Sequence, residues 1–100
     1  MGRMIRHIVF FKAREGADKT EIDAMFTAFR GLPATIPFLK NFSIGHDFSH
    51  RGHFDMGLSC DFETEADVLA YGQHPDHRKI VNEMVAKLCE DNREVVDYHY

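Results

Sequence analysis

The sequence has 100 residues, of which 44% are hydrophobic and 28% charged, and its formal net charge is −4 at pH 7. This size and composition are typical of one globular domain, and no apolar run is long enough to span a bilayer. The negative charge and the lack of a lysine and arginine block exclude a typical nucleic-acid-binding protein. We therefore expect a single domain, residues 1–100, that binds neither nucleic acid nor membranes.

Residues 3–12 alternate in the manner of a β-strand. Two apolar sets lie on opposite sides of this strand: Ile5, His7, Val9 and Phe11 on one, and Met4, Ile8 and Phe10 on the other. Both faces of the strand should therefore be covered. Because the apolar run is short and lacks a small-residue cleavage site, we expect no signal peptide and a cytoplasmic location.

A helix is predicted to follow. Asp18 and Glu21 have the spacing of a capping box, and apolar residues then recur at helical intervals until Gly31 and Pro33 end the pattern. The stripe that should pack on a sheet consists of Ile22, Met25, Phe26, Phe29 and Leu32.

Two further strands are predicted over residues 39–47 and 54–62, where apolar residues alternate with polar or small ones. The segment HDFSHRG between them is turn-rich and, at about half a dozen residues, has the length of a hairpin connection. We expect the two strands to be antiparallel neighbours.

The second helical unit is predicted in two pieces. Thr64 and Asp67 cap a short helix through Tyr71, and Gly72 and Pro75 then predict a break before a longer helix that runs to residue 89. Residues 93–100 form a final β-rich segment. The order β-α-β-β-α-β with a split second helix indicates a ferredoxin-like α+β fold, a four-stranded antiparallel sheet covered by helices on one face.

The second apolar face of the first strand has no helix left to cover it. A sheet covered on one face normally alternates apolar with polar residues, so this face predicts a partner. The less apolar side of the third strand suggests a partly polar contact, with Asp55, Gly57, Ser59 and Asp61. We predict a homodimer in which two sheets stack.

The helix break places Tyr71, His74 and His77 three residues apart. A helix that starts at Pro75 leaves unpaired N–H groups beside His74 and His77, which predicts a polar end for an apolar pocket. His77 would suit a general base with Tyr71 stabilising an enolate oxygen. The structural alternative is that both side chains only tie the helix junction together.

Three histidines, His46, His50 and His53, gather near Asp47 and Asp55. Imidazole and carboxylate groups bind zinc, nickel or copper, but this spacing is not a recognised metal motif. A solvated hairpin loop is the simpler interpretation, and we predict no metal site.

Four segments resemble the stress-responsive A/B barrel (Dabb) domains, a family of dimeric α+β barrels. They are IRHIVFFKAREG, LPATIPFLKNFSIGHDFS, DFETEADVLAYGQHPDH and VVDYHY, and together they cover nearly the whole chain. The His-Pro-x-His element after an aromatic residue is the most specific. The resemblance implies a dimer with a pocket between sheet and helices in each protomer.

The polyketide-cyclase branch of this family implies particular site residues. Its base and tyrosine match His77 and Tyr71, and its first-strand histidine matches His7. Two positions depart from the pattern, because Met56 replaces a histidine and Phe29 replaces a tyrosine. Together with His74 from the helix break, the ligand contacts expected are His7, Phe29 and Met56, and cyclisation of the same substrate is not expected.

The first functional hypothesis is a homodimer that binds a small, mainly apolar molecule without a cofactor. The alternative is a cofactor-independent, polyketide-cyclase-like enzyme in which His77 is the base and Tyr71 its partner. A purely structural assembly protein is a third hypothesis, and a heme- or metal-assisted monooxygenase is disfavoured because only His77 itself resembles a heme ligand.

Overall fold

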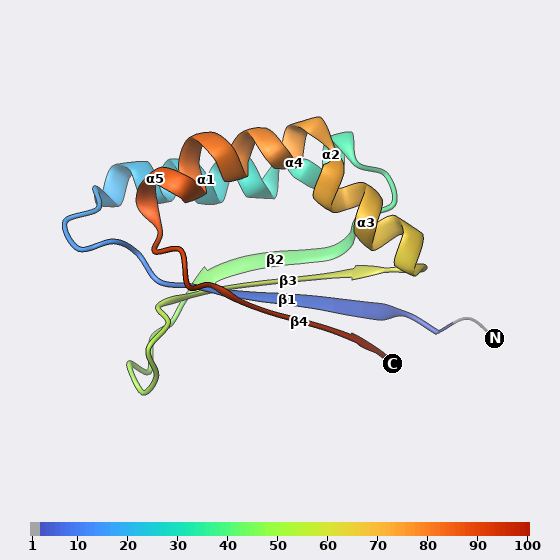
Figure 1. Ribbon diagram of the computed structural model, residues 1–100, viewed down its shortest axis with the longest axis horizontal. Helices are drawn as coiled ribbons and strands as arrows, with labels where there is room; N and C mark the ends of the chain where they lie inside the picture. Colours follow the sequence, from blue (N-terminus) through green and yellow to red (C-terminus); the bar gives the residue numbers. More distant parts are fainter. Residues whose placement is uncertain (1–2) are drawn as a thin grey trace.

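The computed structural model describes residues 3–100 as a sheet covered on one side by helices (Figure 1). Its elements, in chain order, are β1 (Ile5–Phe11), α1 (Lys19–Arg30), α2 (Leu32–Thr35), β2 (Lys40–His46), β3 (Met56–Phe62), α3 (Glu65–Gln73), α4 (Pro75–Ile80), the π-helical turn η1 (Val81–Val85), α5 (Ala86–Leu88) and β4 (Glu94–His99). This order confirms the predicted β-α-β-β-α-β plan and its split second helical unit.

The four strands form one antiparallel sheet in the order β2-β3-β1-β4. The predicted antiparallel pairing of β2 with β3 is confirmed. All the helices lie on the same face of the sheet, while the opposite face is uncovered (Figure 1). The fold is therefore ferredoxin-like.

Helix α1 begins as predicted, because the Asp18 carboxylate accepts hydrogen bonds from the backbone N–H groups of Thr20 at 2.7 Å and Glu21 at 3.4 Å. The prediction for its end is wrong in one respect. Pro33 does not stop helical structure but lies in the first turn of α2, where a missing N–H costs no hydrogen bond. Leu32 accordingly belongs to α2, and its side chain is buried in the same core as α1.

The third strand begins at Met56 and not at residue 54 as predicted. Asp55 explains the difference, because it is held by the end of β1: its N–H donates to the carbonyl of Phe11 at 3.0 Å, and its carboxylate accepts from the N–H of Ala13 at 3.0 Å. The ring of Phe54 stacks on Phe10, with centroids 5.9 Å apart. The connection between β2 and β3 is therefore longer than the sequence indicated.

The core lies between the sheet and the helices. It buries the predicted α1 stripe against the side chains of β1 and β3 that point toward the helices. The most completely buried large side chains of this core include Met25, Phe29, Ile36, Phe62 and Val85. Residue size is tightly constrained there, because truncating such side chains leaves cavities.

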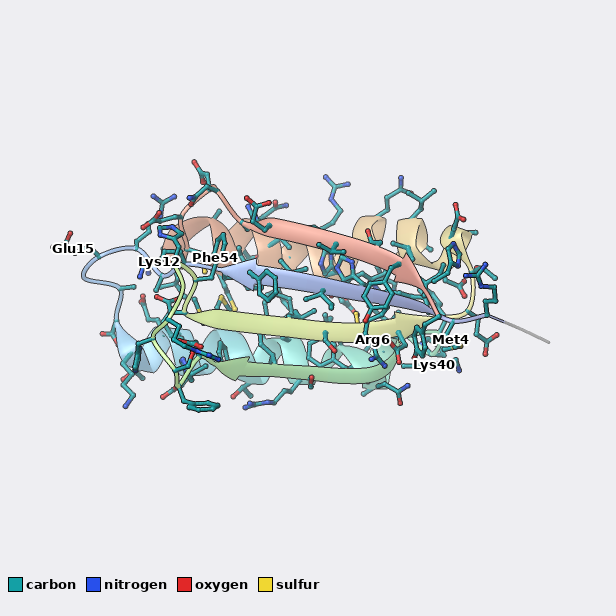
Figure 2. All side chains as sticks on the ribbon, turned by 90° about the horizontal axis from the view of Figure 1, so that it is seen from below. Met4, Arg6, Lys12, Glu15, Lys40 and Phe54 are labelled. Atoms are coloured by element: carbon teal, nitrogen blue, oxygen red, sulfur yellow. The ribbon has the colours of Figure 1, made fainter. Side chains whose placement is uncertain are left out.

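We call the uncovered side of the sheet the open face; Figure 2 shows it in front of the helices. Several large apolar or aromatic side chains on it are exposed to 41–50%, namely Phe10, Val96, Tyr98 and Tyr100. This face is the second apolar face that the alternation of β1 predicted. A monomer would leave it in contact with water, which marks it as an interaction surface.

One carboxylate on the open face is fully buried. Asp61 accepts hydrogen bonds from Arg6 Nε at 2.9 Å, Arg6 Nη2 at 3.1 Å, the Tyr100 hydroxyl at 2.6 Å and Asn41 Nδ2 at 2.8 Å. The Arg6 guanidinium is the main reason that the pKa of Asp61 falls to about 2. The network joins β3 to β1 and to the residue that follows β4.

We expect Asp61→Asn to lower the free energy of unfolding by about 1–3 kcal/mol at neutral pH, because the charged acceptor of these bonds is lost. The folded-state pKa lies below the ordinary value of 3.8, so the contribution is complete above that value and is lost as the pH falls toward about 2. Urea unfolding at several pH values measures it, with Asp23→Asn on the exposed side of α1 as control. A difference between variant and wild type that is the same at about pH 6 and about pH 2.5 would contradict the assignment.

Candidate functional site

A cavity of about 210 Å³ lies between the sheet and the helices, on the side of β1 and β4. It is lined by His7, Val9, Phe11, Phe29, Leu58, Tyr71, His77, Val81, Arg93 and Val95. Four of the residues predicted for the site, His7, Phe29, Tyr71 and His77, are thus brought together around one space. We call it the helix-side cavity.

The break between α3 and α4 places two of these side chains. Helix α3 is capped by Thr64 and ends at Gln73, and α4 starts with Pro75, as the positions of Gly72 and Pro75 predicted. His74 lies between the two helices and has an extended backbone conformation. Its Nδ1 accepts a hydrogen bond from the backbone N–H of Asp76 at 3.1 Å. His74 therefore caps α4 and does not line the helix-side cavity.

This junction holds the neutral imidazole of His77 in a defined tautomer. Its Nδ1 lies 3.3 Å from the carbonyl oxygen of Gly72, and because a carbonyl only accepts, Nδ1 carries the proton. Burial lowers the pKa of His77 below its ordinary value of 6.5, and the nearby His7 and His74 lower it further. At neutral pH the imidazole is uncharged, and its Nε2 keeps a lone pair.

Tyr71 lies against this imidazole, with ring centroids 4.2 Å apart. The tyrosine is buried, with only 2% of its surface exposed, and burial raises the pKa of its phenol above the ordinary value of 10. Tyr71 therefore keeps its proton at neutral pH and is a hydrogen-bond donor. A proton acceptor and a proton donor line the same cavity.

His7 faces them from β1, with its ring centroid 5.8 Å from that of Tyr71. Its Nδ1 lies 2.5 Å from a carboxylate oxygen of Asp97, the residue that pairs with it across β1 and β4. Such a carboxylate orients the ring and favours the tautomer with the proton on Nδ1. His7 is thus a hydrogen-bonded histidine at the edge of the core and also a wall of the cavity.

Strand β4 contributes residues to the site that were not predicted from the sequence. The helix side of β4 and of the residue before it carries Arg93, Val95 and Asp97. The sequence indicated only that residues 93–100 form a β-rich segment. The signal was present, because a ferredoxin-like plan pairs the first strand with the last, and alternation then places Asp97 with Val95 and Arg93 on one face. Their positions relative to His7 could not be predicted without the register between β4 and β1.

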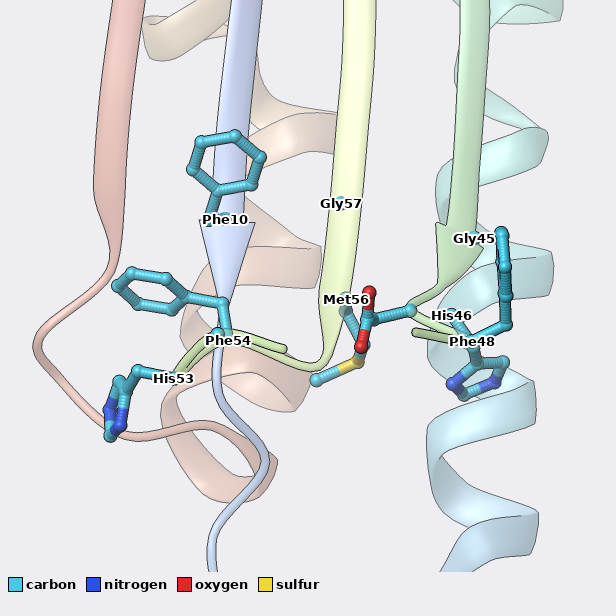
Figure 3. A pocket seen from close by; sticks show the side chains of 10 residues that line it. Phe10, Gly45, His46, Phe48, His53, Phe54, Met56 and Gly57 are labelled. Carbon is cyan, nitrogen blue, oxygen red and sulfur yellow. The ribbon is translucent and has the colours of Figure 1, made fainter. Parts of the chain in front are cut away.

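Met56 lies elsewhere. It contributes to a second hollow of about 490 Å³ at the end of the sheet, together with side chains of β1, β2 and the loop that precedes β3 (Figure 3). Among these, Phe48 is almost fully exposed and Phe54 lies beside His53. Because neither Met56 nor His74 reaches the helix-side cavity, we leave both out of the site proposed below.

The histidine-rich loop separates its three imidazoles. His46 stacks on Phe26 with centroids 4.5 Å apart, and His53 Nε2 lies 3.9 Å from a carboxylate oxygen of Glu90. Within residues 3–100, no three His, Cys, Asp or Glu side chains are placed to hold a metal ion. Over the same range, every helix is too short or too polar to cross a membrane.

Comparison with known sequences identifies one family. The family model described as Stress Responsive A/B Barrel Domain (Dabb) matches residues 5–100. A stress-response A/B barrel domain-containing protein of Arabidopsis thaliana is 33% identical over 91 residues, which are 89% of this chain and 34% of that protein. The chain spans about a third of the length of this curated relative.

Comparison with solved structures gives the same fold. A dimeric ferredoxin-like protein of unknown function from Thermobifida fusca is 33% identical, with a TM-score of 0.86, and covers 100% of this chain and 93% of its own. A dimeric protein of unknown function from Bacteroides fragilis is 28% identical, with a TM-score of 0.85 and coverage of 97% and 96%. The hydroxynitrile lyase of Passiflora edulis is 20% identical, with a TM-score of 0.84 and coverage of 97% and 93%, and shares the fold.

Proposed function

The chain belongs to the stress-responsive A/B barrel (Dabb) family, and from this we propose that it is a homodimer that binds a small, mainly apolar molecule in the helix-side cavity. The observation that carries the proposal is the convergence of His7, Tyr71 and His77 on a space whose other walls are largely apolar. Small-molecule sites commonly combine apolar walls with a few converging polar groups.

The size of the cavity limits the ligand. Its 210 Å³ equals roughly seven water molecules at about 30 Å³ each, which is below the range of about 300–1,000 Å³ typical of drug-sized ligands. A molecule with one ring or a short branched chain suits this space. Polar groups on that molecule would be recognised by the hydroxyl of Tyr71 and the imidazole of His77.

The open face supports the homodimer. The Thermobifida fusca and Bacteroides fragilis neighbours are described as dimeric, and this chain has a sheet face with several exposed apolar side chains. Stacking two such faces would bury that apolar surface and leave the helices outside. The helix-side cavity lies on the other side of the sheet, so each protomer would keep its own.

Filling the cavity should weaken binding. We expect Val95→Phe to weaken binding of phenylacetamide, a one-ring neutral probe, by about tenfold or more, because the larger side chain overpacks the cavity. Isothermal titration calorimetry measures the dissociation constant. Leu69→Phe, which adds a similar ring at an exposed position of α3, is the control and should bind as the wild type does. Equal affinity of Val95→Phe and wild type would place the ligand elsewhere.

A second candidate function, a cofactor-independent proton-transfer enzyme of the cyclase type, is favoured by the state of His77. Its uncharged imidazole presents a free Nε2, which would take a proton from the carbon next to a substrate carbonyl. The electron pair left on that carbon moves to the carbonyl oxygen, where the Tyr71 hydroxyl would donate a hydrogen bond to the resulting enolate. The lyase neighbour supports only the point that this fold accommodates an enzyme.

A further inference from the structure

Arg93 gives the helix-side cavity a cationic end that neither proposed function uses. It directly precedes β4, is partly buried and lines the cavity. The register pairs Phe10 with Glu94, so Arg93 lies next to the end of β1 at Phe11. His7 is four residues away along β1, which separates the two backbone positions by about 14 Å at about 3.4 Å per residue.

Glu94, the residue next to Arg93, pairs with Phe10 and lies on the open-face side of β4. Other acidic side chains near Arg93 in the sequence and across the sheet are engaged with other partners. Within residues 3–100 the ion pairs and hydrogen bonds join Asp91 to Arg14, Glu90 to His53, Asp55 to Lys12 and Asp97 to His7. No ion pair in this part of the chain includes Arg93. A partly buried guanidinium with five N–H donors is thus left available at the wall of a cavity.

The cavity between its two ends is apolar. Val9, Leu58, Val81 and Val95 are among the residues that line it. His7 lies four residues along β1 from the Arg93 end, and Tyr71 and His77 lie with it, since the ring of Tyr71 contacts those of both histidines. A ligand that spans this space meets a cation at one end and the uncharged hydrogen-bonding groups of Tyr71 and His77 at the other. A planar guanidinium matches a carboxylate with two parallel hydrogen bonds.

We infer that the ligand of the helix-side cavity is a small monocarboxylate with an apolar body, and that Arg93 binds its carboxylate. The inference rests on the proposed function, because it names the chemical class of the molecule bound there. It also gives the ligand a direction: the carboxylate lies at Arg93, and the opposite end lies near Tyr71 and His77.

Phenylacetate and phenylacetamide test the inference, because they share a ring and a shape and differ mainly in charge. We expect the wild type to bind phenylacetate about tenfold or more tightly than phenylacetamide, as is typical when a hydrogen bond gains a charged partner. Arg93→Gln should remove this preference by weakening the binding of phenylacetate much more than that of phenylacetamide. Arg93→Lys keeps the positive charge but cannot make the two parallel hydrogen bonds of a guanidinium, so it should retain part of the preference.

Arg78→Gln is the matched control, because Arg78 is an exposed arginine of α4 that does not line the cavity. It should keep the full preference for phenylacetate. Equal affinities of the two probes for the wild type, or an unchanged preference in Arg93→Gln, would overturn the role of Arg93 and leave the cavity proposal standing. If neither probe binds at about millimolar concentration, the proposed function fails and this inference fails with it.

Discussion

Replacing Val96 with glutamate is expected to convert the proposed homodimer into monomers. Val96 lies on the open face, opposite Ile8 of β1, and half of its surface is exposed in one protomer. In a dimer with stacked sheets the substitution buries an unpaired carboxylate in each copy, which costs several kcal/mol or forces its protonation. We expect dimerisation to weaken by about a hundredfold or more, as sedimentation velocity over a concentration series would show.

Val95→Glu is a close control for this experiment. Val95 is the neighbouring residue of the same strand and is equally exposed, but its side chain faces the helices. A stacked-sheet dimer should tolerate the change, and circular dichroism can establish that both variants are folded. A monomeric wild type, or a Val96→Glu variant that stays dimeric, would contradict the stacking of open faces.

The second large effect is expected at His77 if the cyclase-type alternative holds. Deuterium exchange of the hydrogens next to the carbonyl of phenylacetone, followed by proton NMR, reports removal of a proton from carbon. We expect His77→Gln to reduce the enzyme-dependent exchange rate by about 10²–10⁴, the usual contribution of a general base. Tyr71→Phe should also slow exchange, because the enolate oxygen loses its hydrogen-bond donor.

The pH dependence separates a base from a structural residue. Burial lowers the pKa of His77, so the exchange rate should rise with pH along a profile whose midpoint lies below the ordinary value of 6.5. His99→Gln, at a histidine of β4 that lies outside the cavity, should leave rate and profile unchanged. If His77→Gln only lowers the unfolding midpoint while exchange continues at the wild-type rate, His77 serves the helix junction and the binding function alone remains.

Local signals in the sequence predicted most of the fold. The Asp18 cap, the α1 stripe and the break at Pro75 each depend on residues close in the chain, and each is confirmed. The prediction that Pro33 ends helical structure was wrong, because proline is also favoured in the first turn of a new helix. Phe54 was assigned to β3 on alternation alone. The strand begins only at Met56, because Asp55 is held by hydrogen bonds to the end of β1.

The cavity was predictable only in part. Tyr71 and His77 were identified because the local sequence indicates the helix break between them. Arg93, which lines the cavity, and Asp97, which contacts His7, were missed because both are placed by the pairing of β4 with β1, at the two ends of the chain. Met56 was included by resemblance, but it lies at the start of β3, where its buried side chain belongs to the core and borders the hollow beside the 47–55 loop.

The most direct test of the binding proposal is a proton–nitrogen correlation NMR titration of the labelled wild-type protein with phenylacetamide. The proposal predicts that the largest shift changes occur at residues around the helix-side cavity, such as His7, Tyr71, His77 and Val95, and reach saturation. Changes concentrated on the open face, or around Phe48 and Phe54 in the second hollow, would contradict a ligand site between the sheet and the helices.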